Sequence, residues 1–559
     1  MVIRGMPALA VTFEPLFDSH QKVTSIAVTV RCDAYFVQAD KPFLTLRRRA
    51  GNFDLPDYHD DTNSIRVSDD RGNLPLQKDR DPDALLQTWR ATRASEGQVT
   101  WSFIAPPRQI TAATRPGARS DLRLDQGGII GSLNYFFLRP MPMYPEQQWK
   151  ISVAWKLDKA PAGTRAMWTF GGGSITRSRL ATVDDLINTY LAVGQLQGTR
   201  PAADNGISNP YGTYWFGELP PALLGLEAAS KDYFQKLSEL YQDPLSATNP
   251  YRIFIRRADP ATSFGGEAFL RSYCLEWSTR GILSETQLSV FMIISHEMIH
   301  NWALLKSAAD GPSGNDGRGT AWYNEGVGEL HGITLPWRFG LISTGDMIKH
   351  LNLNLQAYYT SSVINMSNAD VVEHEYEDPS VQLLLYNRST VYSMLVDIKI
   401  RQATGRTKSL DDIIIPLSLR RLRRERHDEA EYRKYLMELL GTDSDLDDML
   451  RGDLVKLPSL WPGLPIQLIR QDRYMFTKGY TKEGNVISAV VKGSRAEEAG
   501  ITAGDSIISE KGIEDCILDD SKLLKVVVER GGQDVEIQFL PRSRTLVPCW
   551  EWVEECEAS

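Results

Sequence analysis

Two histidines and a glutamate stand at a spacing that suits metal chemistry. His296, Glu297 and His300 lie within residues 295–302, which read Ser-His-Glu-Met-Ile-His-Asn-Trp. On a helix, residues four apart share one face, so His296 and His300 can direct imidazole nitrogens at one metal ion. Glu297 is rotated by about 100° around the helix, outside this pair but near a metal-bound water. The spacing predicts zinc hydrolysis with Glu297 as the general base.

A third ligand is offered by Glu325, within residues 322–326, which read Trp-Tyr-Asn-Glu-Gly. A catalytic zinc takes three protein ligands and keeps one position open. We therefore expect one zinc ion per chain, held by His296, His300 and Glu325. Such an ion lowers the pKa of its water to about 7, and Glu297 can pass the proton to a leaving amine. The alternative is a pair of histidines packed in a core.

The elements that must position these residues have readable signals. Ser284 fits a helix N-cap, with Gln287 at the reciprocal capping-box position, so we expect the metal-binding helix to start there. The glycine-rich stretch 310–319 predicts a loop close to the site, which either shapes substrate access or is a tolerated surface insertion.

The whole chain is interpreted as a multidomain α+β protein. Residues 1–185 alternate apolar and polar positions between turns, which predicts an N-terminal antiparallel β domain. Residues 186–460 are mainly helical with a small β-sheet around 251–256, and they contain the metal motif. After a turn-rich linker, residues 466–545 return to short strands. We expect three domains with these boundaries.

Composition excludes several classes of function. The 559 residues are 42% hydrophobic and 24% charged, which is ordinary for a globular protein. A formal net charge of −9 and a pI near 5.6 argue against nucleic acid as a partner. The five scattered cysteines contain no CxxC pair, so neither a disulfide framework nor a thiolate zinc site is expected.

The expected location follows from the absence of an apolar targeting or spanning segment. The N-terminus gives no convincing signal peptide, and no segment approaches the roughly 20 apolar residues needed to span a bilayer. We therefore expect a soluble, cytoplasmic or otherwise intracellular protein with no membrane span. The sequence gives no prediction of its oligomeric state.

The combined motifs resemble a known family. The His296–Trp302 segment followed by Trp322-x-x-Glu325-Gly326 is similar to the gluzincin metallopeptidases, in particular the glycyl aminopeptidase-like family. Residues 409–412, which read Ser-Leu-Asp-Asp, match that family as well. The resemblance implies a β-rich N-terminal domain, a thermolysin-like catalytic domain and a C-terminal PDZ domain, with a peptide or protein as substrate.

The C-terminal block resembles a PDZ domain by itself. A strand at 485–491, an Ala-Gly segment at 496–500 and a Gly-Asp turn at 504–505 follow one another in the order of that domain. The resemblance implies a carboxylate-binding loop near 476–480, and hence a peptide ligand captured by edge-strand addition.

The same resemblance assigns a second catalytic group. Tyr386 would donate a phenolic hydrogen bond to the oxyanion, the role that gluzincins give this tyrosine. The family's Tyr-x-Lys-Gly is here Tyr386-Asn387-Arg388-Ser389, so the tyrosine is retained while its neighbours differ. Tyr392 is the nearby rival, and its alternative role is core packing.

One departure bears on specificity. Residues Gly265, Gly266, Glu267 and Ala268 occupy the place of the family's Gly-Gly-Leu-Glu, an edge strand that lies along the substrate. The family's glutamate, which holds a free α-amino group, falls on Ala268, with Glu267 one residue early. Adjacent strand side chains point to opposite faces, so Glu267 substitutes only if the strand bulges. Aminopeptidase action is thus open against endopeptidase or another specificity.

Two further alternatives are open. Glu329, one helical turn after Glu325, either orients a ligand from the second coordination sphere or is a solvated helix carboxylate. The chain as a whole is a zinc peptidase or, in a different class, a catalytically retired peptide-binding scaffold with a PDZ module. Retention of Glu297 favours the peptidase, because a retired site has no chemical need for a base.

Overall fold

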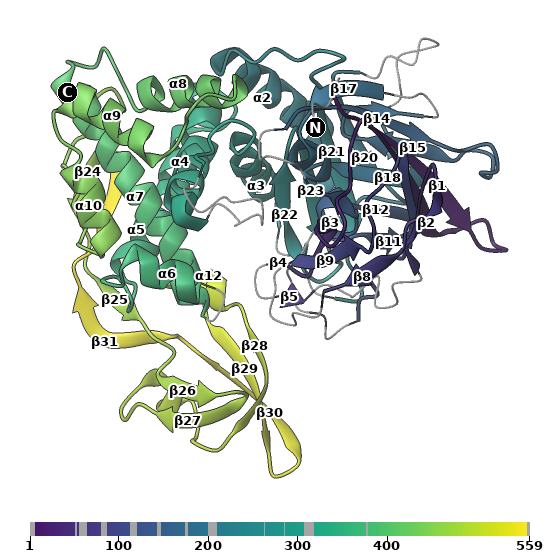
Figure 1. Cartoon of the computed structure of the whole chain (residues 1–559). Coiled ribbons are helices and arrows are strands. Elements are labelled where there is room, and N and C mark those ends of the chain that lie inside the picture. Colours follow the sequence, from purple (N-terminus) through teal and green to yellow (C-terminus); the bar gives the residue numbers. More distant parts are fainter. Residues whose placement is uncertain are drawn as a thin grey trace. The chain divides into compact units, whose positions relative to one another are not determined.

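The computed structural model describes residues 6–50, 53–54, 64–79, 86–111, 114, 120–141, 147–173, 177–199, 209–261, 263–283, 285–306, 318–375 and 378–555. The chain divides into two compact units. The first comprises Met1–Asn301 with Gly311–Gly314, and the second comprises Trp302–Asp310 with Asn315–Ser559. Figure 1 shows the elements of both.

Sheets dominate the N-terminal part of the first unit. One sheet runs in the order β17 (Arg177–Ala181), β14 (Trp149–Trp155), β1 (Ala8–Phe17), β2 (Val23–Asp33), β10 (Val99–Ala105), β6 (Arg66–Asp69), β7 (Gly72–Asn73). A second runs β11 (Arg123–Asp125), β12 (Gly128–Ser132), β18 (Tyr190–Gly194), β15 (Arg165–Trp168), β16 (Gly171–Gly172). A third runs β13 (Arg139–Pro140), β3 (Pro42–Arg47), β9 (Leu86–Ala91), β8 (Leu76–Lys78). The short pair β4 (Arg49–Ala50) and β5 (Phe53–Asp54), the 3-10 turn η2 (Leu133–Tyr135) and helix α1 (Val183–Ile187) complete it.

The predicted β-rich character of this part is confirmed, with one correction. The strands alternate buried and exposed residues as expected, for example along β1, and their buried side chains form one hydrophobic cluster. However, β1 pairs in parallel with β14 while it pairs antiparallel with β2. The sheet is therefore mixed, because β14, which follows the intervening strands in the sequence, pairs with the other edge of β1.

A mixed sheet with helices on one face supports the metal-binding helix. Its strand order is β19 (Gln197–Gly198), β20 (Tyr211–Trp215), β21 (Tyr251–Arg257), β23 (Ser272–Trp277), β22 (Phe264–Phe269). Helices α2 (Leu226–Leu240) and α3 (Gln287–Ile299) pack against it, with α3 contacting β22 and β23. The ring of Phe234 on α2 stacks on Tyr251 at 3.9 Å, whereas Phe254 on the opposite face contacts Tyr190 of β18.

Helix α3 begins later than the sequence predicted. Thr286 is its N-cap, and its hydroxyl accepts from the backbone N–H of Ser289 while the Ser289 hydroxyl closes a reciprocal capping box. The predicted start at Ser284 is wrong, and Ser284 itself lies outside the described residues. The Ser-x-x-Gln pattern was outcompeted by a second hydroxyl cap two residues further on.

The second unit begins with helices. They are η4 (Arg318–Thr320), α4 (Ala321–Arg338), α5 (Thr344–Tyr359), α6 (Asn368–His374), α7 (Pro379–Ala403), α8 (Asp411–Leu422), α9 (Glu429–Leu440) and α10 (Ser444–Arg451). The long helix α7 begins with proline at N1 and Asp378 as N-cap, and it packs against α4, α5 and α6. Most of the predicted loop 310–319 lies outside the described residues.

Short strands and two small helices follow in the same unit. The main sheet runs β26 (Tyr480–Glu483), β27 (Val486–Val490), β28 (Ser506–Lys511), β29 (Leu524–Arg530), β30 (Gln533–Phe539), with α11 (Arg495–Glu498) and α12 (Ile513–Leu518). Strands β25 (Arg473–Phe476) and β31 (Arg542–Val547) pair, as do β24 (Ile466–Arg470) and β32 (Trp550–Glu554). Ala357 of α5 is part of the hydrophobic cluster of this region, so the strands and the helices share a core. The three predicted domain boundaries stay predictions.

Two further observations concern the helices and the cysteines of the described residues. Among the described residues, no helix combines the length and the apolar character that crossing a membrane requires. Cys32, Cys274, Cys516 and Cys549 are buried free thiols.

Candidate metal centre

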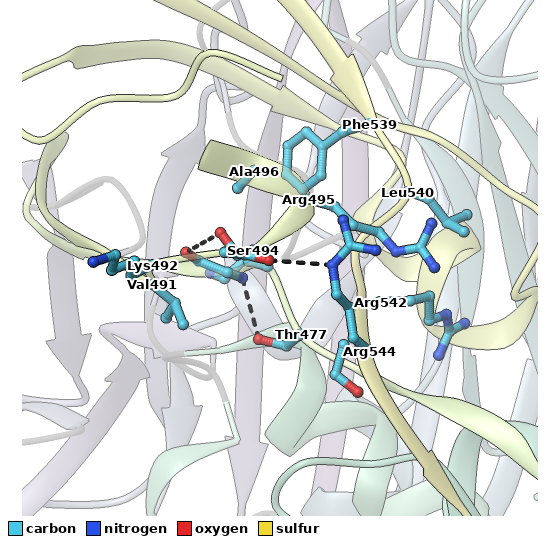
Figure 2. Close-up of a pocket in the computed structure, with 14 residues that line it drawn as sticks. Thr477, Val491, Lys492, Ser494, Arg495, Ala496, Phe539, Leu540, Arg542 and Arg544 are labelled. Carbon is cyan, nitrogen blue, oxygen red and sulfur yellow. Dashed lines mark hydrogen bonds between the residues drawn. The ribbon is translucent and has the colours of Figure 1, made fainter. Parts of the chain in front are cut away.

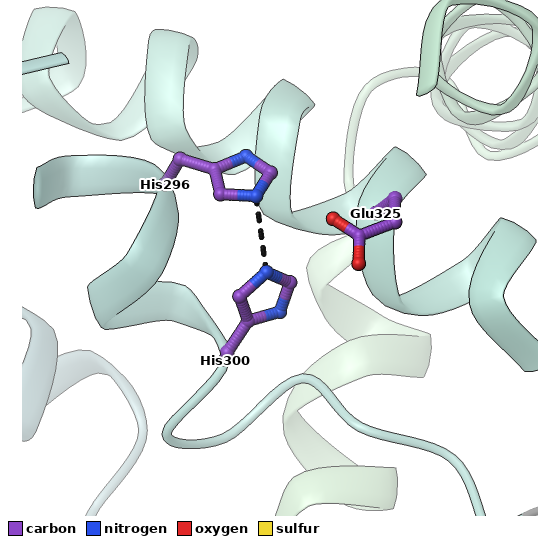
Figure 3. Close-up of side chains that lie close together, drawn as sticks. All are labelled: His296, His300 and Glu325. Atoms are coloured by element: carbon purple, nitrogen blue, oxygen red, sulfur yellow. Dashed lines mark hydrogen bonds between the residues drawn. The ribbon is translucent and has the colours of Figure 1, made fainter. Parts of the chain in front are cut away.

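Three predicted ligands lie close together. His296, His300 and Glu325 each offer one ligand atom, and these atoms all lie within 4.8 Å of one another. The Nε2 atoms of the two imidazoles are 3.0 Å apart, and the ring planes meet at 84°. Figure 3 shows the two rings turned toward each other with the Glu325 carboxylate beside them. All three residues are half-buried.

Helix geometry produces the histidine pair. His296 lies in the last turn of α3, and His300 is the C-cap residue with φ −59° and ψ −15°, still in the helical region. The four-residue spacing is therefore preserved although the helix ends at Ile299. The Asn301 N–H donates to the Met298 carbonyl at 3.1 Å, which tightens this end of the helix. Met298 and Ile299, which lie between the two histidines in the sequence, are buried and anchor the last turn.

The donor set fits zinc. Two imidazole nitrogens and a carboxylate match the ligands of a catalytic zinc site, with room for a water as the fourth. Two nitrogens bound tetrahedrally to one zinc ion would be about 3.3 Å apart, given bonds of roughly 2.0 to 2.1 Å. The observed separation of 3.0 Å between the Nε2 atoms is close to that value.

The position of Glu325 depends on a close approach of two helices. A Cβ atom on Gly326 would lie 2.6 Å from the backbone oxygen of Ser389 on α7. Only glycine lets α4 come this near to α7. The neighbouring Asn324 accepts a hydrogen bond from the Leu305 N–H at 3.0 Å, and Thr320 donates to the Leu305 carbonyl at 3.1 Å. These contacts fix the start of α4, and thereby the turn that carries Glu325.

Tyr386 lies on α7 one turn before Ser389. It is half-buried, whereas the residues that follow it, Asn387, Arg388 and Ser389, are buried. The i, i+3 spacing puts Tyr386 on the same side of α7 as the contact with α4. Its rival Tyr392 is fully buried, and its ring contacts Trp322 edge-on at 5.9 Å. Core packing accounts for Tyr392.

Glu297 is half-buried on α3, one residue after His296. Its charge acts on two groups in the adjoining sheet. Burial, and to a smaller extent the negative charge of Glu297, raises the pKa of Tyr251 well above its usual value. The same two causes raise the pKa of Glu267. Glu297 therefore lies near enough to the sheet that carries β22 to influence both groups.

The edge strand β22 keeps its register. It pairs residue for residue with β23, from Phe264 opposite Trp277 to Phe269 opposite Ser272. Glu267 therefore points to the opposite face from Gly266 and Ala268, as predicted. The Tyr135 hydroxyl donates to Glu267 Oε1 at 2.9 Å, and the Ser120 hydroxyl donates to Oε2.

Other predicted residues have structural partners. Asn354 on α5 donates to Glu329 Oε1 at 3.0 Å, so Glu329 links α4 to α5 and is more than a solvated carboxylate. His331 is buried, with Nε2 3.2 Å from Asp411 on α8. Burial alone would raise the pKa of Asp411, but His331 and Arg338 hold it well below its usual range.

Several residues that shape the site were missed from the sequence. Ser120 and Tyr135 are 147 and 132 positions from Glu267, so no local pattern could have revealed them. Asn324 stands inside the recognised motif, yet its bond to Leu305 depends on how the chain leaves α3. The Gly326 contact had a possible signal, since glycine within a helix often marks a close approach.

The loop expected to bind a carboxylate lines a cavity. This cavity has a volume of about 300 Å³ and includes Thr477 and Gly479 of that loop (Figure 2). Its lining is cationic around an apolar wall of Val491, Ala496, Phe539 and Leu540. The cationic side chains are Lys478, Lys492, Arg495, Arg542 and Arg544.

Comparisons with known proteins show the fold. No protein-family model matches the sequence, and no curated protein sequence matches it. Among solved structures, an aminopeptidase N family protein from Idiomarina loihiensis matches with a TM-score of 0.67 at 15% identity, over 98% of each chain. A mutant M1 zinc metallopeptidase from Deinococcus radiodurans, bound to a Tyr-Ser-Ala substrate, matches with a TM-score of 0.50 at 12% identity, over 82% of this chain and 96% of that one. The chain has the fold of the aminopeptidase N type of metallopeptidase.

Replacing Gly326 with alanine tests the helix contact. Because the new Cβ would meet the Ser389 backbone, we expect Gly326→Ala to lower the free energy of unfolding by about 2 kcal/mol. Gly345→Ala on α5 is the matched control, since its nearest neighbour atom is 3.8 Å away. That change should be neutral or slightly stabilising. Urea unfolding of the three proteins checks this, and equal effects of both changes would contradict the role of Gly326.

Proposed function

We propose that the chain is a zinc-dependent peptidase that resembles the glycyl aminopeptidase-like gluzincins. The observation that carries this proposal is the convergence of one ligand atom each from His296, His300 and Glu325. The fold shared with metallopeptidases of the aminopeptidase N type supports it. One zinc ion per chain, held by these three residues, would polarise the scissile carbonyl and lower the pKa of a water.

The chain's own residues have distinct tasks in this proposal. Glu297 takes a proton from the attacking water and delivers it to the leaving amine, because it lies one residue from His296 on the same helix. Tyr386 donates a hydrogen bond to the oxyanion of the tetrahedral species. Its place on α7, beside the α4 turn that carries Glu325, supports this role. Glu329 positions α4 through its bond with Asn354.

Removing the base separates this proposal from the retired scaffold. Glu297→Gln keeps the size of the side chain but cannot take up the proton. We expect the native chain to bind one zinc and to cleave peptides of a mixed library, and the variant to bind zinc with kcat lowered by about 10³-fold. Metal analysis and mass spectrometry of the products check this. Zinc binding without cleavage by either protein would support the scaffold, and a chain that neither binds zinc nor cleaves would contradict the peptidase.

A second candidate specificity is cleavage of internal bonds. It is favoured by Glu267, because both of its carboxylate oxygens accept hydrogen bonds, from Tyr135 and from Ser120. A carboxylate engaged in this way, on the face opposite Ala268, is a poor anchor for a substrate ammonium group. The rival specificity, removal of N-terminal residues, requires that Glu267 exchange these partners for the amine. Glu267 is near enough to Glu297 for the negative charge of Glu297 to raise its pKa, so Glu267 lies in the neighbourhood of the proposed base.

Paired peptides with free and acetylated N-termini distinguish the two specificities. For internal cleavage we expect acetylation to change kcat/KM by less than about twofold, because no amine anchor contributes. Glu267→Gln should then affect both peptides equally. If Glu267 binds the amine, acetylation should reduce kcat/KM by about 100-fold or more, the worth of a charge-assisted contact that is lost. Glu267→Gln would then impair only the free peptide.

We also propose that the cationic cavity near 477–479 binds the C-terminal carboxylate of a peptide, as the PDZ resemblance implies. Cationic side chains around an apolar wall, exposed Lys492 among them, suit such a ligand. We expect Lys492→Glu to weaken binding of a free-acid peptide by at least about threefold. An amidated peptide and Lys511→Glu, an exposed residue outside the lining, are the controls. Fluorescence anisotropy measures the binding, and equal binding of acid and amide would contradict the proposal.

A further inference from the structure

We propose that the C-terminal strands position Tyr386, acting through Arg542 and helix α7. This inference rests on the proposed peptidase function, in which Tyr386 stabilises the oxyanion. It assigns the C-terminal part of the chain a role in catalysis that is separate from any peptide it captures.

Arg542 ties three elements together. It lies at the start of β31 and is 2% exposed. Its Nη1 donates to the hydroxyl of Thr360, the C-cap of α5, at 3.2 Å. Its Nη2 donates to the carbonyl oxygens of Cys516 and Ile517 near the end of α12. The guanidinium therefore satisfies polar groups at the ends of two helices at once, a task for which its fixed fork of donors is suited.

Neighbouring bonds reinforce the same junction. The Phe476 N–H of β25 donates to the Thr360 carbonyl at 2.9 Å, and the guanidinium of Arg542 lies 5.3 Å from the Phe476 ring centre. Gln356, one turn earlier on α5, donates to the Leu518 carbonyl of α12 at 2.9 Å. The end of α5 is thus joined to β25, β31 and α12. Displacing Arg542 leaves buried carbonyls unpaired, so these elements would shift relative to one another.

Helix α12 transmits this constraint to α7. It packs against both α5 and α7. Leu383 of α7 packs against the hydrophobic cluster of the C-terminal strands, which also contains Cys516 and Ile517 of α12. Leu383 lies one turn before Tyr386, and the i, i+3 spacing puts the two residues on the same side of α7. The turn of α7 before Tyr386 therefore packs against the hydrophobic core of the C-terminal strands.

The other side of Tyr386 is fixed by α4. Ser389, one turn after Tyr386, meets Gly326 at the close approach of the two helices. By the helical period, Tyr386 stands about 60° around α7 from each of Leu383 and Ser389 and one turn from both. Tyr386 therefore lies on α7 between two contacts, one that Leu383 makes with the C-terminal core and one that Ser389 makes with α4. Loosening the first contact lets α7 tilt while the second still holds Glu325 in place.

Amide hydrogen exchange on the full chain tests the coupling from Arg542 through α12 to α7, and it needs no measurement of activity. Arg542→Met preserves much of the side-chain length but removes every donor. We expect the amide exchange of residues 383–390 in α7 to accelerate by at least about tenfold, because the turn before Tyr386 loses its packing against the C-terminal core. Arg544→Met is the matched control on the same strand, since Arg544 bonds to Gly493 and Glu498 within the C-terminal strands. It should leave α7 unchanged. Acceleration confined to residues 466–555 would overturn the inference.

Kinetics test the consequence for the reaction. We expect Arg542→Met to lower kcat by about tenfold, with KM within about twofold and full zinc content, because only the oxyanion donor is misplaced. Arg542→Lys, which can still donate to one acceptor, should restore part of the rate. In a Tyr386→Phe background the same change should have no further effect, since the hydroxyl that it misplaces is gone.

The outcomes are distinct from those that test the proposed function. Independent, multiplicative losses in the Tyr386→Phe background, or zinc loss in proportion to the rate, would overturn positioning and leave the peptidase standing. A native chain without zinc or cleavage would contradict the peptidase. The exchange result alone would then show whether Arg542 is coupled to α7. If Arg542→Met does not fold, Leu383→Ala interrupts the same path by removing packing, and the same exchange and kinetic results are expected from it.

Discussion

The close approach of α4 and α7 at Gly326 is the constraint on which the candidate site depends. Helices normally pack with side chains between them, but here the α4 backbone meets the Ser389 backbone of α7 without an intervening Cβ. This contact fixes the position along α7 of the α4 turn that carries Glu325. It also sets the side of α7 on which Tyr386 lies. Two groups with different proposed tasks, a metal ligand and an oxyanion donor, are thereby fixed by a single contact between helices.

The histidine pair is fixed by a separate set of contacts. The apolar residues of α3 pack on a mixed sheet, and the helix ends at His300 without losing its helical backbone. The same sheet ends in β22, whose Glu267 accepts hydrogen bonds from Ser120, in a turn, and from Tyr135, in η2. In the proposed function, the metal ligands and the residue that bears on specificity thus depend on different parts of the fold. The histidine pair follows from helix geometry, whereas the hydrogen bonds of Glu267 depend on segments that are distant in sequence.

The sequence predicted what local periodicity encodes. The sequence alone showed the four-residue spacing of His296 and His300, the glutamate within the second motif, and the mixture of β-rich and helical blocks. The N-cap at Thr286 was missed because Ser284 offered a competing pattern two residues earlier. Partners of Glu267 could not be predicted, since they depend on tertiary contacts across more than a hundred residues. The sharing of a core by Ala357 and the C-terminal strands was hidden for the same reason, because nothing in the strand sequences indicates which helix will cover them.

The central claim is that His296, His300 and Glu325 bind one zinc ion. An anomalous difference map, recorded at the zinc edge on crystals of the full chain, tests it most directly. We predict a single strong peak per chain, about 2.0 to 2.1 Å from both Nε2 atoms and about 2.0 to 2.2 Å from a Glu325 oxygen. A peak bound by other residues, or no peak at these three side chains after zinc is supplied, would contradict the account.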